Sequence, residues 1–322
     1  MSPLEFLSIL SSKTTGISFT RFQELYRLID IYDVKKDPSL LFGPSLPSYL
    51  SENKNWFDEV LRDFEFYHKN EIHHLYPNHP LYPEDFYTLE KPPLFLSLEG
   101  DLSCLNKNKV SVVGSRHPTA AALEWMDIHL TPLVEDGAVL VSGAARGIDQ
   151  RAHLVSIKNQ KPTIAFLPSG LRQVYPPEFS KWKEKIVEYG GLIVSEYEYS
   201  QPIHRHHFHE RNRMIAKMGL FVLVCEARRK SGSTMTARLA IDNSKTVCVL
   251  PGFPSAKNSQ GCLDLLFQGA IPVRDYEDLT VLLSAEYLSA GNSFQNLREK
   301  LFVPDSLNDI SAREKKDNIR DP

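Results

Sequence analysis

Hydrophobic and polar positions follow two different patterns along the 322 residues of the chain. Near the N-terminus, apolar side chains recur with helical spacing over 4–12, 19–32 and 55–70. Breaks, including the proline-rich segment 76–86, separate these stretches from the rest of the chain. The pattern therefore predicts a small N-terminal helical module over residues 1–70.

Further along, short β-branched apolar runs alternate with amphipathic stretches of helical length. The runs are apolar on both faces, as in a parallel sheet that helices cover on both sides. Repeated units of this kind predict an α/β fold, with an extended Rossmann-like, doubly wound and mainly parallel sheet. We expect this domain to span residues 71–284, and a polar C-terminal tail to follow over 285–322. The predicted strands lie at 110–114, 138–143, 162–170, 191–196, 220–227 and 246–252.

The charge is distributed unevenly. The formal net charge is −3, so the chain as a whole is not a basic nucleic-acid coat. Residues 204–230 differ, because they hold seven Arg or Lys against two acids, together with four histidines. Such a stretch in an acidic chain predicts an anion-binding surface, and a solvated basic face is the alternative that stays open.

Several features of the sequence bear on the cellular compartment. No apolar run approaches the roughly 20 residues of a membrane-spanning helix, and the N-terminus lacks the pattern of a secretory signal. The four cysteines show neither CxxC nor zinc-like spacing, and two of them, Cys225 and Cys248, lie within apolar runs. These features predict a cytoplasmic protein without a membrane segment.

Small and polar residues follow three of the predicted strands. Ligands of an open α/β sheet bind at the carboxyl ends of the strands, where loops and helix starts converge. Glycines allow tight turns there, amides at a helix start bind phosphate, and an arginine adds a bidentate grip. Three such loops at one edge predict a phosphate-binding site. Its candidate residues are Gly114, Ser115 and Arg116, then Ser142, Gly143 and Arg146, and finally Ser231, Gly232, Ser233 and Thr234.

Other chemistries lack their motifs. No G-x-G-x-x-G follows a strand and no G-x-x-x-x-G-K-[ST] occurs, so dinucleotide binding, motor activity and kinase activity are not indicated. Asp149, Glu196 and Glu226 lie at strand ends, where we expect them to fix loops rather than form a general acid–base pair. We therefore expect no catalytic residues and no cofactor.

A histidine-rich segment and two aromatic residues need separate interpretation. The spacing of His204, His206, His207 and His209 matches no closed metal site, so we expect no bound metal. Partly protonated imidazoles beside phosphates, or a solvated loop, are the remaining interpretations. Phe208 and Tyr175 are candidate stacking surfaces for bases, with ordinary packing as the alternative.

The ordered motifs between residues 82 and 275 resemble the DprA/Smf family of bacterial DNA-processing proteins. Arg116 falls on the arginine of the family's GSR motif, and Arg146 falls where members often carry lysine. Arg211, Asn212 and Arg213 match the family's RNR signature. Further matching segments are Tyr82-Pro83, Pro92-Pro93, Ser142-Gly143, Gly147-Ile148-Asp149, Ala152-His153, Thr163-Ile164-Ala165, Tyr175-Pro176, Ser195-Glu196, Glu226-Ala227, Ser231-Gly232-Ser233, Thr236-Ala237, Pro251-Gly252 and Gly269-Ala270.

This resemblance implies a function that no single motif establishes. It implies a homodimer that binds and protects single-stranded DNA in a basic pocket and helps load a RecA-type recombinase during DNA uptake, natural transformation and recombination. It also implies Arg211, Asn212 and Arg213 as DNA-binding residues, and Phe208 joins them as a candidate stacking surface. The chain departs from the family pattern in its histidine-rich approach to the RNR signature, at Cys262, and in a polar C-terminal segment too short for a winged-helix module.

A nucleotide-processing or nucleotide-sensing protein on a related sheet is the competing hypothesis. Nucleoside-monophosphate phosphoribohydrolases carry a PGGxGT loop, whereas residues 231–234 of this chain read Ser-Gly-Ser-Thr. The absence of that loop favours a binding protein over an enzyme.

Overall fold

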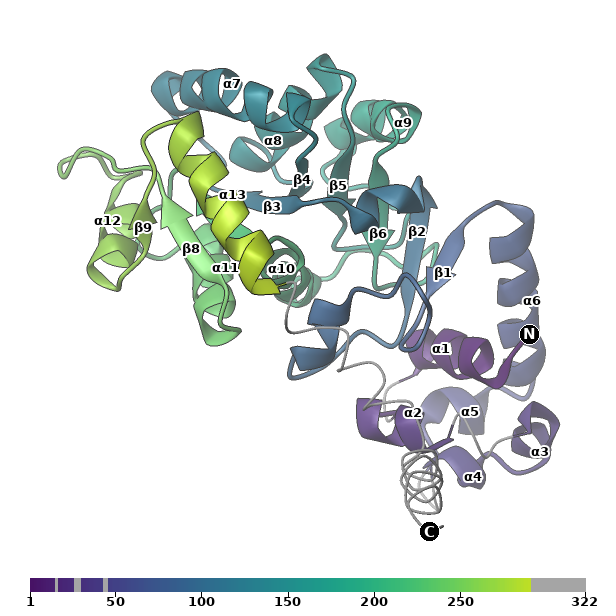
Figure 1. The fold of residues 1–322 in the computed structure, drawn as a ribbon. Helices are drawn as coiled ribbons and strands as arrows, with labels where there is room; N and C mark the ends of the chain where they lie inside the picture. The colour runs from purple at the N-terminus through teal and green to yellow at the C-terminus, as the bar shows by residue number, and fades with distance from the viewer. Residues whose placement is uncertain (15–16, 26–29, 43–45, 291–322) are drawn as a thin grey trace, which may run out of the picture.

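A nine-stranded sheet runs through the part of the chain that the computed structural model describes, which is residues 1–14, 17–25, 30–42 and 46–290 (Figure 1). Its order is β1-β2-β6-β5-β4-β3-β7-β8-β9. All six predicted strands are present and pair in parallel, whereas the edge strands β1 and β2 are antiparallel. The strands are β1 (His73–Leu75), β2 (Leu96–Gly100), β3 (Lys109–Val113), β4 (Val139–Gly143), β5 (Thr163–Phe166), β6 (Leu192–Ser195), β7 (Phe221–Val224), β8 (Thr246–Val249) and β9 (Ile271–Pro272).

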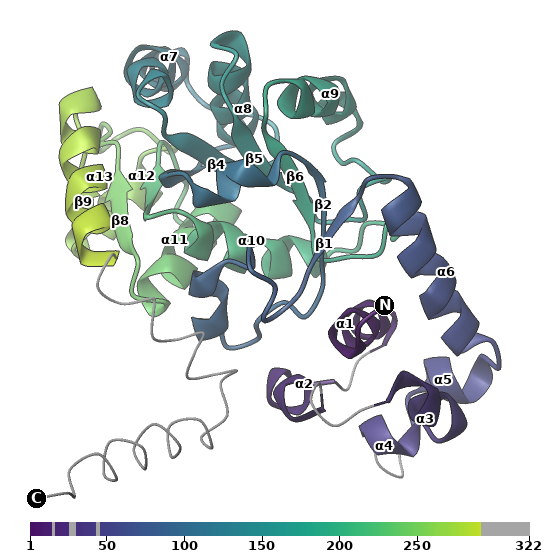
Figure 2. The same cartoon turned by 45° about the vertical axis from the view of Figure 1, so that its right-hand side comes forward.

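Helices cover both faces of this sheet, so the predicted doubly wound Rossmann-like fold is confirmed (Figure 2). On β4, Leu140 packs with α7 and α8, while Val139 and Val141 pack with α10 and α11 on the other face. This alternation explains why the strands are apolar on both sides. The helices are α7 (Ala120–Glu135), α8 (Ile148–Lys158), α9 (Ser180–Glu188), α10 (His207–Met218), α11 (Gly232–Asp242), α12 (Gln260–Phe267) and α13 (Tyr276–Ala290), with 3₁₀ turns at Glu84–Thr88, Leu102–Asn106 and Pro177–Phe179.

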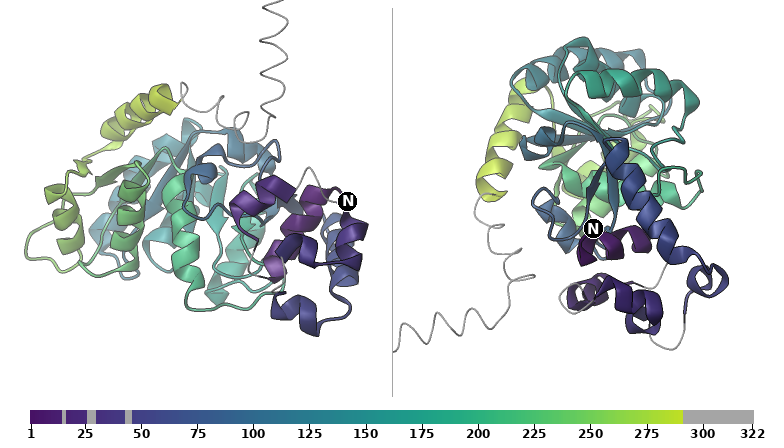
Figure 3. Two further views of the ribbon diagram at one scale, coloured as in Figure 1. Left: turned by 90° about the horizontal axis from the view of Figure 1, so that it is seen from below. Right: turned by 90° about the vertical axis from the view of Figure 1, so that its right-hand side faces the viewer.

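The N-terminal helices gather at the β1 end of the sheet, opposite α13 (Figure 3). The prediction of one helix over 19–32 is wrong, because Asp30 caps a new helix by accepting the N–H of Tyr32 at 2.7 Å. Two further helices, of four and five residues, are too short to give a periodic pattern. The helices are α1 (Pro3–Lys13), α2 (Phe19–Leu25), α3 (Ile31–Lys36), α4 (Ser39–Phe42), α5 (Ser48–Glu52) and α6 (Trp56–Lys69).

At the other end of the chain, α13 continues to Ala290, beyond the position 284 at which the polar tail was expected to begin. In this added turn, Glu286 accepts the hydroxyl of Thr246 on β8 at 2.5 Å, which ties the end of the helix to the sheet. The rest of the predicted tail, 291–322, lies outside the described residues.

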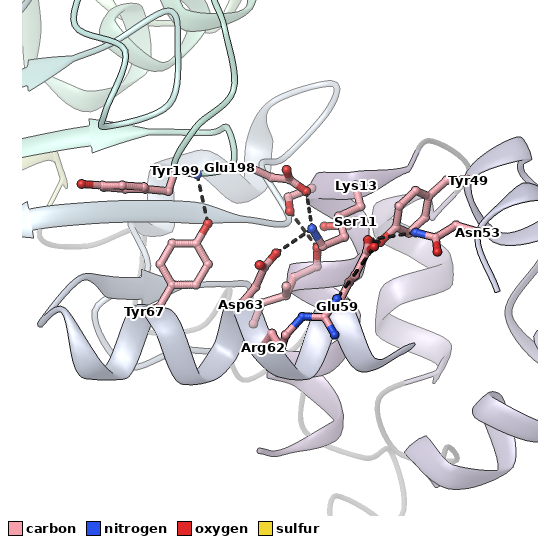
Figure 4. Close-up of polar contacts among 12 residues, drawn as sticks. Ser11, Lys13, Tyr49, Asn53, Glu59, Arg62, Asp63, Tyr67, Glu198 and Tyr199 are labelled. Carbon is pink, nitrogen blue, oxygen red and sulfur yellow. Dashed lines mark hydrogen bonds and ion pairs between the residues drawn. The ribbon is translucent and has the colours of Figure 1, made fainter. Parts of the chain in front are cut away.

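A buried lysine ties the N-terminal helices to the loop that follows β6 (Figure 4). Nζ of Lys13, whose side chain is 9% exposed, lies 2.6 Å from Asp63 Oδ2 on α6 and 2.9 Å from Glu198 Oε1. Burial lowers the pKa of Lys13, but the two carboxylates outweigh it and raise that pKa above its usual value. Nearby, the hydroxyl of Tyr67 accepts the N–H of Tyr199 at 3.2 Å. Both contacts hold the segment that leads from β6 to α10.

Replacing Lys13 by methionine is expected to lower the free energy of unfolding by about 1–3 kcal/mol, because Asp63 and Glu198 would be left partly buried without their cation. Urea denaturation measures the change. Lys36→Met is the matched control, since Lys36 pairs with Asp33 at the surface and should contribute less than about 0.5 kcal/mol. Equal losses in the two variants would show that Lys13 does not tie the module to the sheet.

Candidate nucleic-acid interface

The strand order places β3 at the topological switch point of the sheet. From β3 the chain proceeds to β4, β5 and β6 on one side, and it then crosses to β7, β8 and β9 on the other. The loops after β3 and β7 leave their strands in opposite directions, which opens a crevice at the carboxyl ends of these two strands. The three loops selected from the sequence follow β3, β4 and β7, so they meet at this crevice.

The loop after β3 is fixed against α8 and α11. A Cβ on Gly114 would lie 2.5 Å from Cγ1 of Ile148, so a side chain does not fit there. The backbone oxygen of Ser115 accepts the N–H of Ile148 at 3.1 Å, and that of Gly114 accepts the hydroxyl of Ser233 at 2.7 Å. The guanidinium of Arg116 is exposed and lies 5.9 Å from the ring centre of Phe208. The loop is therefore rigid at its backbone while Arg116 can reach a ligand.

The glycine after β4 makes room for a buried arginine. A Cβ on Gly143 would lie 1.5 Å from Nη1 of Arg211, which belongs to α10, and 2.7 Å from Oδ2 of Asp149. Nη1 of Arg211 donates to the backbone oxygen of Phe166 at 3.1 Å. The carboxylate of Asp149 accepts the backbone N–H groups of Gly143 and Ala145. Within the described residues, Nε of Arg211 is buried without a hydrogen-bond partner.

The loop after β7 begins α11 with a capping box. The hydroxyl of Ser231 accepts the N–H of Thr234 at 3.2 Å, and the hydroxyl of Thr234 accepts the N–H of Ser231 at 3.1 Å. The N–H groups of Gly232 and Ser233 lie in the first turn, where backbone donors have no partner within the helix. A Cβ on Gly232 would meet nothing within 4 Å, so this turn faces open space. It offers backbone donors and the positive end of the helix dipole to an anion.

These elements enclose a cavity of about 480 Å³. Four arginines line it against the single carboxylate of Asp149, so the cavity carries an excess of positive charge. Residues on α10 contribute to its wall through one helical face, since Phe208, Arg211, Asn212 and Ile215 follow the i, i+3, i+4, i+7 spacing. The four arginines are Arg116, Arg205, Arg211 and Arg228.

A second cavity of about 240 Å³ adjoins the first, and Arg116, Phe208 and Arg211 line both. Its walls include Arg146 and the aromatic ring of Tyr175, which is 43% exposed. The rings of Tyr175 and Phe208 meet edge to face at 5.9 Å. Nε of Arg146 pairs closely with Glu178, an exposed carboxylate that a ligand would have to displace. The smaller cavity is thus lined by both aromatic rings and arginine side chains.

Three carboxylates at strand ends are occupied by contacts within the protein, as expected from their positions in the sequence. Burial raises the pKa of Asp149 to about 6, and the positive charges of Arg211 and Arg116 oppose this rise. Burial likewise raises the pKa of Glu196 to about 7, against its ion pair with Arg213. Glu226 accepts the N–H and the hydroxyl of a threonine at the start of α7, at 3.0 and 2.6 Å.

Four of the candidate residues do not line either cavity. Ser142 is buried on β4 and donates to the backbone of β3 at 2.6 Å. Gly143 leaves the space that Arg211 occupies, and Thr234 takes part in the capping box of α11. Arg213 points away from the site, because it pairs with Glu196 and Glu210. The remaining candidates lie at the cavities: Gly114, Ser115, Arg116, Arg146, Phe208, Arg211, Asn212, Ser231, Gly232 and Ser233.

Sequence reasoning did not select Arg205, His117 or Arg228 and left the role of His209 open, and all four line the larger cavity. For Arg205, His209 and Arg228 the available signal was the basic stretch 204–230, but that stretch also contains buried residues. Lys217, for example, is buried and donates to the backbone oxygen of Asn243 at 2.9 Å. Only the fold separates the cations that reach the cavity from those that stabilise α10.

Neither a metal site nor a membrane-spanning helix is found among the described residues. No cluster of three or more His, Cys, Asp or Glu side chains within 1–14, 17–25, 30–42 and 46–290 has the arrangement of a metal site. In the same residues, no helix has both the length and the apolar character that crossing a bilayer requires. The four cysteines are buried free thiols.

The fold and the site together define a Rossmann-like α/β protein with an arginine-rich cavity at its topological switch point. The model of one family, DNA recombination-mediator protein A, matches residues 73–284. The chain therefore belongs to the DNA recombination-mediator protein A family, which is the DprA/Smf family that its motifs resemble.

Individual relatives agree with this assignment. Protein Smf of Escherichia coli is 35% identical over 208 residues, which cover 64% of this chain and 56% of that protein. DNA processing protein DprA of Streptococcus pneumoniae is 30% identical over 264 residues, covering 80% of this chain and 92% of that protein. The match thus spans little more than half the length of the Escherichia coli relative.

Solved structures show the same similarity. DNA processing protein A from Streptococcus pneumoniae aligns with a TM-score of 0.69 at 26% identity, covering 87% of this chain and 98% of that one. The protein from Helicobacter pylori aligns with a TM-score of 0.61 at 32% identity, covering 67% of this chain and 97% of that one. The Helicobacter pylori structure is described in terms of its single-stranded DNA binding mode.

Proposed function

We propose that this protein binds single-stranded DNA in the two adjoining cavities and acts as a recombination mediator without catalysing a reaction. The observation that carries the proposal is the excess of arginine at a cavity that also contains the open first turn of α11. Guanidinium groups and free backbone amides are the donors that phosphate groups favour. The single-stranded DNA binding mode described for the Helicobacter pylori relative supports the same ligand.

The two cavities contact different parts of the strand. Phosphates lie against Arg116, Arg211 and the α11 turn, while bases stack on Phe208 and Tyr175 in the smaller cavity. Stacking is tolerant of sequence, because every base has an aromatic face. Contacts to phosphates carry no sequence information, so we expect little sequence preference.

The proposal extends to the pathway that the family name indicates. Bound strands are protected and passed to a RecA-type recombinase in the cytoplasm, during DNA uptake, natural transformation and recombination. Membership of the recombination-mediator family supports this part, since a mediator hands DNA to another protein. Asp149, Glu196 and Glu226 are each occupied by arginine or backbone donors, which supports binding rather than phosphoribohydrolase chemistry. The proposal includes no cofactor.

Single strands should be favoured over duplex, because the cavities accept phosphates and unstacked bases. Fluorescence anisotropy with labelled oligo(dT) and with the matching duplex measures this preference. Affinity for oligo(dT) should fall steeply as salt increases, since phosphate contacts release counterions. Equal affinity for the two forms would contradict the proposal, and release of free base from a nucleoside monophosphate would favour the enzyme hypothesis.

A homodimer is part of the proposal, and its surface lies at the end of the sheet opposite the N-terminal helices. Large apolar side chains are exposed there on α12, β9, α13 and the loop after β8, with Phe267 93% and Phe253 77% exposed. Apolar patches of this kind mark protein–protein interfaces. A dimer would place two cavities on one assembly, so that one strand engages both and gains avidity.

Replacing Phe267 by aspartate should convert the dimer to a monomer, because a charge would enter an apolar interface. Light scattering at micromolar concentration measures the mass, and a length series of oligo(dT) measures the avidity. Wild-type affinity should rise sharply once the strand can bridge two cavities, and the variant should lack this threshold. A wild-type monomer with no length threshold would remove the dimer from the proposal.

A further inference from the structure

The histidine-rich segment before α10 forms an exposed rim beside the larger cavity. His204, Arg205, His206 and His209 are exposed, and two of them, Arg205 and His209, line the cavity itself. The rings of His204 and His206 stack with their centres 5.8 Å apart. We use the name histidine rim for these four residues.

The rim is held in place by a buried member of the same segment. His207 stacks on Tyr197 with ring centres 3.8 Å apart, and its Nδ1 lies 3.1 Å from the backbone oxygen of Pro168. The rings of His204 and His206 pack edge-on against His207 at 4.9 and 4.5 Å. The exposed imidazoles therefore project from a fixed point at the start of α10.

No carboxylate forms an ion pair with a rim residue anywhere in the described part of the chain. Glu198 and Glu210, the acids nearest in sequence, pair with Lys13 and Arg213 instead. His209 shares the cavity with one carboxylate and several cations. Its Nδ1 lies 2.9 Å from Sδ of Met235, which belongs to α11. The charged or titratable groups that share the cavity are Asp149, Arg116, His117, Arg211 and Arg228.

We propose that the histidine rim is a second backbone-binding surface for the strand, continuous with the cavity and active only when its imidazoles carry protons. This inference rests on the proposed function and extends the binding path beyond the arginines. Imidazole is the side chain whose charge ordinarily changes between about pH 5 and pH 8, so we expect the contribution of the rim to binding to grow as the pH falls through that range. Because no acid of the described residues pairs with the rim, its side chains are available to phosphates.

The expected gain follows from counterion release. Each phosphate contact to a single strand changes the slope of log K against log salt by about 0.7, which near 0.1 M salt corresponds to roughly fivefold in affinity. Affinity for oligo(dT) should therefore rise about tenfold between about pH 8 and pH 6, and the salt dependence should become steeper.

The test compares three variants with the wild type, all as the full-length protein, by anisotropy with oligo(dT) at several pH values and salt concentrations. In the rim variant, His204→Asn, His206→Asn and His209→Asn are combined, which removes the titrating groups and keeps polar side chains. A control variant combines His68→Asn and His73→Asn, two exposed histidines at the β1 end of the molecule. Asp149→Asn removes one further titrating group of the cavity, because burial raises the pKa of that carboxyl to about 6.

The proposal expects the rim variant to lose the gain in affinity at low pH. The control variant and Asp149→Asn should retain most of the gain. A full gain in the rim variant, or loss of the gain in Asp149→Asn alone, would overturn the proposal. The absence of oligo(dT) binding by the wild type at every pH would instead overturn the proposed function.

Discussion

Replacing Gly143 by alanine should lower the free energy of unfolding by about 2–4 kcal/mol and weaken binding of single-stranded DNA at least tenfold. The new Cβ would lie 1.5 Å from Nη1 of Arg211, so the guanidinium would have to leave its place beside Asp149. Asp149 would then be buried without its arginine, and its negative charge would face the incoming phosphates. Urea denaturation and oligo(dT) titration measure the two effects.

Gly232→Ala is the matched control, because it adds the same methyl group at another glycine of the cavity. A Cβ at this position meets nothing within 4 Å, and alanine is favoured over glycine in a helix. Its stability should be unchanged or slightly higher than that of the wild type. If Gly143→Ala behaved like Gly232→Ala, the placement of Arg211 in the site would be wrong.

Replacing Arg116 by alanine should weaken oligo(dT) binding by about 1–3 kcal/mol, which is roughly 5- to 150-fold, without a measurable loss of stability. Arg116 is exposed and lines both cavities, so its removal deletes a phosphate donor and, within the protein, a cation–π contact with Phe208 at 5.9 Å. Arg146→Ala should have a smaller effect, since Arg146 must first give up its ion pair with Glu178.

Two further variants sharpen this prediction. Arg116→Lys keeps the charge but loses bidentate geometry, so its affinity should fall between those of the wild type and Arg116→Ala. Arg62→Ala removes an exposed arginine from α6, far along the chain from the cavity loops, and should bind as the wild type does. Wild-type binding by Arg116→Ala would exclude Arg116 from the interface.

The sheet could be predicted because its strands are apolar on both faces. The six parallel strands are such runs, and each appears where the sequence placed it. The strands β1 and β9 gave a weaker signal, since they have three and two residues and the β9 residues are exposed. Short edge strands are defined by the neighbour with which they pair rather than by their own pattern.

Within the site, sequence located the loops but not the direction of each side chain. The RNR signature treats Arg211 and Arg213 alike, yet residues two apart on a helix differ by about 200° in direction. Arg211 therefore enters the cavity and Arg213 pairs with Glu196. The role of Gly143 depends on Arg211, a residue far along the chain, so no local motif could reveal it.

A crystal structure of the protein with bound oligo(dT) tests the central claim most directly, because it locates the strand. The account predicts a phosphate within hydrogen-bond distance of the first turn of α11 or of the guanidinium groups of Arg116 and Arg211. A strand that is ordered elsewhere on the surface, with the arginine-lined cavity left empty, would contradict it.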